Sequence, residues 1–76
     1  MKTCIAAINS MNICIRAQKT LSENGYFSKI ISLDPSLTKK GCAYGIEFSI
    51  YEERKIKNIL RHTNIPVSQY IHPKEE

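Results

Sequence analysis

The sequence of 76 residues lacks tryptophan, has only three glycines and three prolines, and contains no C-x-x-C pair. No apolar run approaches the roughly 18 residues that a membrane-spanning helix needs. The apolar stretch before Asn9 is also shorter than the ~7–15-residue core of a signal peptide. The sequence has three cysteines, Cys4, Cys14 and Cys42, and this odd number argues against a disulfide framework. We therefore expect a cytoplasmic protein with reduced thiols and no membrane association.

The length and composition predict one small domain, residues 1–72, followed by a frayed tail, residues 73–76. Hydrophobic residues make up 42% of the chain and charged residues 24%, which are ordinary values for a globular protein. The net charge of +4 is mild, and the basic residues are scattered. This charge is compatible with RNA, with an acidic protein partner, or with solubility alone.

Hydrophobic patterning predicts four strands and two helices. A helix runs from an Asn9-Ser10 cap to Asn24-Gly25, with its apolar residues at helical spacing. A second helix follows the S-x-x-E capping box at Ser49–Glu52 and ends at Asn64. The predicted strands cover residues 2–8, 26–33, 43–50 and 67–71.

This order forms two βαβ halves that echo each other, each with a helix end, an asparagine stop and a return strand. It predicts an α+β fold, a ferredoxin-like βαββαβ sandwich in which two helices cover one face of a four-stranded antiparallel sheet. The first and third strands would be central. The other face would be open, or covered by a partner.

The loop from Asp34 to Gly41 is longer than an ordinary hairpin connection and leads directly to Cys42. Cys4 and Cys14 fall on predicted core positions, which leaves Cys42 as the candidate catalytic thiol. The neighbouring cations would stabilise its thiolate or dock an acidic partner, and the small residues around it would give access to the sulfur. These predicted site residues are Lys39 and Lys40 for charge, and Gly41, Ala43 and Gly45 for access.

The sequence lacks the residue patterns that other kinds of functional site require. Cys42 has no cysteine or histidine close to it in sequence, whereas zinc and iron–sulfur sites usually need about four ligands. We find no assembled triad, glycine-rich phosphate loop or RNP-type aromatic motif, so we expect no metal, no cofactor and no strong nucleic-acid binding. The spacing alone leaves Cys42 open as a nucleophilic, sulfur-carrying or inert thiol.

The segment L-T-K-K-G-C-A-Y-G-I-E-F, together with the opening strand, the Asn9-Ser10 helix start and the final helix, resembles the DUF3343 family of putative Se/S carrier protein-like sequences. The family pattern has glycine directly after the cysteine, where this chain has Ala43. The resemblance implies a carrier or accessory protein rather than a stand-alone enzyme. Its Cys42 would accept a persulfide or selenide from a cysteine-desulfurase-type donor and pass it to an acceptor protein.

Three alternatives remain at this point. The chain would instead be a non-catalytic interaction module that docks a larger enzyme through its open sheet face, or a weak RNA-binding module. A redox-sensing thiol is a variant of the carrier hypothesis. An exposed sheet face would also allow a homodimer.

Overall fold

Strands and helices follow one another along the chain in the predicted order, β-α-β-β-α-β. The computed structural model describes residues 2–39 and 41–73, so the predicted tail lies outside the described residues except for Pro73. The strands are β1 (Thr3–Ile8), β2 (Lys29–Ser32), β3 (Tyr44–Ser49) and β4 (Gln69–Ile71); the helices are α1 (Met11–Glu23) and α2 (Glu53–His62). Two short 3₁₀ turns, η1 (Pro35–Leu37) and η2 (Ile50–Glu52), precede β3 and α2.

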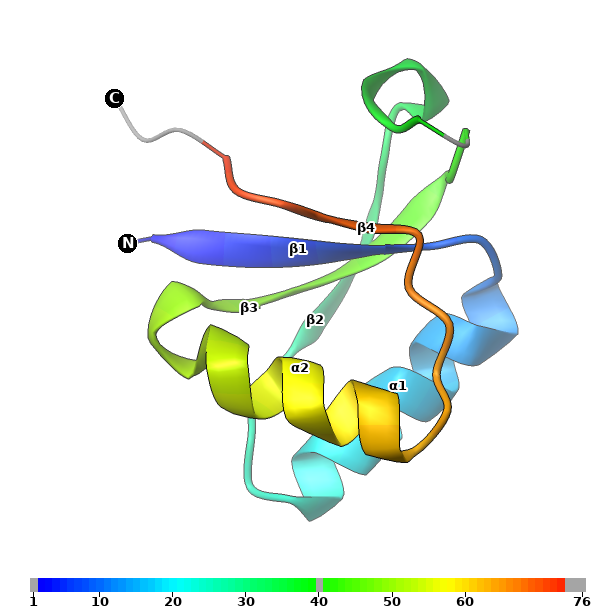
Figure 1. Ribbon diagram of the computed structural model, residues 1–76. Helices are drawn as coiled ribbons and strands as arrows, with labels where there is room; N and C mark the ends of the chain where they lie inside the picture. Colours follow the sequence, from blue (N-terminus) through cyan, green and yellow to red (C-terminus); the bar gives the residue numbers. More distant parts are fainter. Residues whose placement is uncertain (1, 40, 74–76) are drawn as a thin grey trace.

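The sheet has the order β2-β3-β1-β4, and every neighbouring pair is antiparallel. The two strands of each βαβ half are therefore separated by a strand of the other half, and β1 and β3 are central as predicted. Both helices lie on one side of the sheet (Figure 1). This small α+β fold is consistent with the predicted ferredoxin-like arrangement. Among the described residues, neither helix has the length and apolar character needed to cross a bilayer.

Local sequence explains where the helices begin and end. Ser10 caps α1, because its side-chain oxygen accepts the Ile13 backbone N–H at 3.4 Å. At the other end Gly25 adopts φ +84°, and the Tyr26 N–H bonds to the Leu21 carbonyl at 2.8 Å. This is a Schellman motif, in which glycine takes the left-handed position.

The end of α2 repeats this motif with asparagine. Asn64 has φ +58°, and the Ile65 N–H bonds to the Leu60 carbonyl at 3.0 Å. Asparagine tolerates the left-handed region better than most residues, so the second half of the chain closes its helix in the same way as the first.

Several boundaries differ from the prediction. β2 begins at Lys29 and β4 at Gln69, later than predicted, because the residues before them complete the turn from each helix. Ser49 does cap a helical turn, but its oxygen accepts the Tyr51 N–H at 3.3 Å and starts the 3₁₀ turn η2. Ile50 therefore leaves the sheet, and α2 begins only after that turn.

The core lies between the sheet and the helices. Its fully buried members include Cys4 and Cys14, as predicted, and the apolar stripes of β1, β3 and both helices. The helix-free face is less open at its centre than predicted, because Ile5 is 7% exposed and Ala7 is fully buried. Gly45 lies on this same face, where Ile5 and Leu33 approach it closely.

Candidate functional site

The loop between β2 and β3 is closed at its base by a backbone hydrogen bond. The Leu33 N–H donates to the Ala43 carbonyl at 2.8 Å, which continues the β2–β3 ladder by one bond. Just above it, the Asp34 carboxylate accepts the Ser36 N–H at 3.0 Å and starts η1. Hydrogen bonds from Ser36 also lower the pKa of Asp34. Figure 1 shows this loop in green above the sheet, whereas the helices lie below it.

Thr38 organises the part of the loop that leads to Cys42. Its hydroxyl oxygen accepts the Cys42 N–H at 2.6 Å and donates its own proton to the Pro35 carbonyl at 3.1 Å. Gly41 adopts φ +68°, a left-handed conformation that glycine enters without strain. The Thr38 hydroxyl and the left-handed Gly41 therefore direct the Cys42 side chain back into the protein.

The Cys42 side chain is fully buried, and its sulfur has a specific partner. The Cys42 Sγ lies 3.0 Å from the Ser68 Oγ, to which the thiol donates. A second contact joins the same two segments, because the Lys39 N–H donates to the Gln69 Oε1 at 2.8 Å. Ser68 is itself held by β1, since its N–H donates to the Ala7 carbonyl at 2.9 Å. The two side chains before and at the start of β4 thus fasten the loop to the sheet.

Three residues of the site, Thr38, Ser68 and Gln69, were not predicted from the sequence. Thr38 stands only four residues before Cys42, in a loop where side-chain hydroxyls commonly bond to the backbone. That spacing was a usable signal. Ser68 and Gln69 lie 26 and 30 residues from their partners, so only the position of β4 beside β1 brings them to the loop.

The predicted access residues differ in their placement. Gly41 is exposed in the loop and Ala43 is half-buried at its base. Gly45 instead lies within β3, and a Cβ at this position would stand 2.9 Å from the Ile5 Cγ2 and 3.1 Å from the Leu33 Cδ1. The absence of a side chain at Gly45 therefore leaves space for the side chains of Ile5 and Leu33. The sequence pattern predicted an approachable sulfur, whereas the folded chain buries Cys42.

The predicted cations are not both described. Lys39 is exposed, and its backbone N–H makes the contact to Gln69 given above. Lys40 lies outside the described residues.

The other two cysteines have the character of core thiols. Burial, followed by the nearby Glu53 carboxylate, raises the pKa of Cys4 to about 11. Burial also raises the pKa of Cys14, with Cys42 as the second cause. Both thiols therefore stay protonated at neutral pH, which is an unreactive state for a cysteine.

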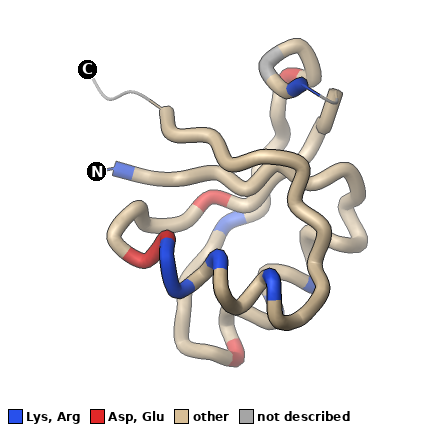
Figure 2. Tube along the Cα trace, in the orientation of Figure 1, with Lys and Arg blue, Asp and Glu red and all other residues tan. Residues whose placement is uncertain are grey.

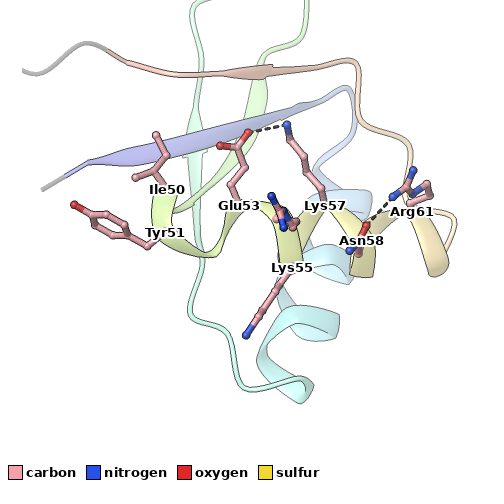
Figure 3. Close-up of a pocket in the computed structure, with 8 residues that line it drawn as sticks. Ile50, Tyr51, Glu53, Lys55, Lys57, Asn58 and Arg61 are labelled. Carbon is pink, nitrogen blue, oxygen red and sulfur yellow. Dashed lines mark hydrogen bonds and ion pairs between the residues drawn. The ribbon is translucent and has the colours of Figure 1, made fainter.

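A basic surface lies on the solvent side of α2, in a different part of the sequence from the Cys42 loop. Figure 2 shows basic positions recurring along this helix. A shallow hollow here is lined by Arg54, Lys55, Lys57 and Arg61, beside Tyr51, whose side chain is 83% exposed (Figure 3). We define these five residues as the α2 basic surface. An exposed aromatic ring among cations is suited to contact with an acidic macromolecule.

Comparison with known proteins adds one match. The model of a family described as "Putative Se/S carrier protein-like" matches residues 3–72, which include both βαβ halves and the Cys42 loop. No curated protein and no solved structure matches the chain.

Proposed function

The chain belongs to the "Putative Se/S carrier protein-like" family, and we propose that it carries sulfur or selenium on Cys42 in the cytoplasm. The observation that supports this proposal most is the placement of Cys42 within the matched region. It is the one cysteine that a loop presents, and its sulfur is paired with a hydroxyl group rather than packed only against apolar side chains. Cys4 and Cys14, in contrast, lie within strand β1 and helix α1 rather than in a loop.

The transfer is a thiol exchange. The Cys42 thiolate attacks the outer sulfur of a donor persulfide, a new sulfur–sulfur bond forms, and the donor leaves as a thiolate. An acceptor nucleophile then attacks the outer sulfur of the Cys42 persulfide, and Cys42 leaves as a thiolate in turn. Neither step changes the overall oxidation state or needs an external oxidant. A cysteine-desulfurase-type enzyme is the donor we propose, and the acceptor is a second protein.

Ser68 has a defined part in this proposal. A serine hydroxyl both donates and accepts, so Ser68 Oγ accepts from the Cys42 thiol and can rotate to donate to the thiolate. Hydrogen bonds to a charged group favour that charged form. Ser68 would therefore donate a hydrogen bond to the Cys42 thiolate that leaves when the acceptor takes the sulfur.

Burial of the sulfur means that transfer requires the loop to open. Among the loop residues that the structure describes, the hydrogen bonds that tie the loop to residues 68–69 are Lys39 to Gln69 and Cys42 to Ser68. Each neutral hydrogen bond contributes about 0.5–1.5 kcal/mol. A docked donor could offset that cost, so the carrier would expose its sulfur only when a partner is present, and would otherwise shield the persulfide from water.

The direct test is intact-protein mass spectrometry after incubation with a cysteine desulfurase and cysteine. Wild type should gain the mass of one sulfur atom, which a reducing agent removes. Cys42→Ser should gain none, whereas Cys14→Ser, a matched control at another buried cysteine, should still be loaded. Circular dichroism checks that each variant is folded. The proposal fails if wild type gains no sulfur, or if Cys42→Ser gains as much.

A second test addresses loop opening. Gln69→Ala removes the acceptor of the Lys39 N–H, so the open loop should become more populated and Cys42 should be alkylated roughly two- to tenfold faster. Peptide mapping identifies which cysteine has reacted. Asn58→Ala, a polar truncation on the distant helix α2, is the matched control and should leave the rate unchanged. Equal rates in Gln69→Ala and wild type would contradict the opening mechanism.

A second candidate function is an interaction module, favoured by the α2 basic surface. Here an acidic protein partner would bind α2, and Cys42 would be incidental. The double variant Arg54→Glu and Lys55→Glu should then abolish partner binding, whereas alkylated Cys42 should leave it intact. Binding of single-stranded RNA that falls steeply with salt would instead indicate the weak RNA-binding alternative.

A further inference from the structure

We propose that the protein has a second, separate site that binds a zinc ion through Cys4, Glu53 and His72. The sulfur of Cys4, a carboxylate oxygen of Glu53 and an imidazole nitrogen of His72 all lie within 4.8 Å of one another. Cys4 lies near the start of β1, whereas the Cys42 loop adjoins its other end, where Ile8 pairs with Tyr44. The zinc site is therefore independent of the proposed sulfur transfer.

The three groups come from distant parts of the sequence. Cys4 belongs to β1, Glu53 to the first turn of α2, and His72 follows β4 directly. Within the fold, the pairing of β4 with β1 brings the chain after Ile71 back beside the start of β1. Sequence spacing could not indicate this site, because no two of its residues form a short metal-binding motif.

The donor atoms suit zinc. Zinc binds thiolate sulfur at about 2.3 Å and imidazole nitrogen or carboxylate oxygen at about 2.0–2.2 Å, so tetrahedral ligand atoms lie roughly 3.3–3.8 Å apart. A set of atoms within 4.8 Å of one another can adopt that geometry with small movements. His72 is exposed and Glu53 is partly exposed, so both can adjust, while the buried Cys4 anchors the site. Water would fill the fourth position, as in other zinc sites with three protein ligands.

Glu53 and His72 already belong to a polar network that includes Lys57. The His72 Nε2 lies 2.8 Å from the Glu53 Oε2, and the Lys57 Nζ lies 2.7 Å from the same oxygen. Figure 3 shows the Lys57 side chain directed toward Glu53. Lys57 also lies over the Tyr70 ring, 4.5 Å from its centroid. This ammonium group lies against the carboxylate that the proposed zinc ion would use, so the two cations would compete for Glu53.

Binding therefore has two costs. The Cys4 thiol loses its proton to solvent as the zinc–sulfur bond forms, because a zinc-bound thiol is a thiolate. The Lys57 ammonium also leaves Glu53, which costs little because Lys57 is 40% exposed and its long side chain can turn to water. The second cost can be tested directly, because removing Lys57 should strengthen zinc binding.

The experiment uses the full chain with Cys14→Ala and Cys42→Ser, so that Cys4 is the only cysteine. Cobalt(II) serves as the spectroscopic probe and zinc(II) as the competitor. We expect one metal ion per chain and a sulfur-to-cobalt charge-transfer band, which only Cys4 can produce. His72→Ala should weaken zinc binding at least about tenfold, since even the outer partners of metal ligands have effects of that size. Lys57→Gln should tighten it roughly two- to fivefold.

His62→Ala is the matched control. His62 is exposed at the end of α2, and within residues 2–39 and 41–73 its hydrogen-bond partner is the Asn58 carbonyl of the same helix, 2.7 Å from its Nδ1. Its loss should therefore not change zinc binding. If the single-cysteine background does not fold, competition with a chromophoric chelator compares His72→Ala and His62→Ala in the wild-type chain. Absence of the charge-transfer band in the folded variant overturns the proposal. So do equal zinc affinities of the two histidine variants.

Discussion

Gly45→Ala should destabilise the protein, because the space beside Gly45 is already filled. An added Cβ would lie 2.9 Å from the Ile5 Cγ2, 3.0 Å from the Ala6 carbonyl oxygen and 3.1 Å from the Leu33 Cδ1. The two side chains can shift, but the Ala6 oxygen belongs to the backbone of a central strand. Overpacking of this kind costs about 1–3 kcal/mol, and the stiffer unfolded chain of the alanine variant offsets about 0.4–1 kcal/mol of it.

The expected net loss is about 1–2 kcal/mol in the free energy of unfolding. This corresponds to a fall in melting temperature of roughly 4–16 °C for a domain of this size. Urea denaturation followed by circular dichroism measures it directly. A double-mutant cycle with Ile5→Ala then isolates the contact: the cost of Gly45→Ala should become smaller in that background, yet remain above zero because the Ala6 oxygen is still present.

Gly25→Ala supplies the control for this cycle. Gly25 has φ +84°, and no described atom beyond its adjacent residues lies within 4 Å of the point where a Cβ would stand, so its substitution strains the backbone without touching Ile5. Its cost should be the same with and without Ile5→Ala. Unchanged or increased stability of Gly45→Ala would refute the packing argument. If that variant instead reacted more slowly at Cys42 while keeping its stability, Gly45 would serve access to the sulfur.

Three further predictions concern the cap, the core and the loop. Ser10→Ala should cost about 1 kcal/mol of unfolding free energy, whereas Asn9→Ala should have little effect; equal losses would contradict the cap assignment. Burial raises the pKa of Cys14 in the folded chain above its ordinary value of 9.0. As the pH rises past 9.0 the unfolded chain loses this proton first, so the free energy of unfolding falls until the folded chain loses it too. Urea midpoints measured from about pH 7 to 10 should therefore fall more for wild type than for Cys14→Ala, and parallel curves would exclude this linkage. Gly41→Ala should strain the loop by roughly 1–2 kcal/mol and speed Cys42 alkylation, whereas Gly41→Asn should do so less; no change in either would show that φ +68° is not required.

Much of the fold follows from local patterns. The apolar stripe of α1 and the alternation in β3 identify their buried faces, since one face of each must pack on a core. Ser10 and Gly25 mark the ends of α1 through bonds within a few residues. The order of elements then leaves few topologies open, which is why the sheet arrangement was predictable.

The environment of the cysteines was only partly predictable. Periodicity placed Cys4 and Cys14 in the core, and both are there. It also separated Cys42 from them, but could not show that this sulfur is buried against Ser68. The sequence of a loop does not by itself indicate which surface the loop packs against, because that surface is formed by a strand distant in the sequence.

The amino-acid sequence by itself determined the helices, the strands and their order, and with them the loop position of Cys42, because each depends on residues close together in the chain. The tertiary structure decided which side chains meet. It brought Ser68 and Gln69 to the Cys42 loop, and Glu53 and His72 to Cys4. The contacts of Ser68, Gln69 and His72 depend on β4 pairing with β1, whereas Glu53 reaches Cys4 because α2 packs on the sheet. The physical reason is that strand pairing and helix packing are set by burial of the whole core rather than by any local pattern.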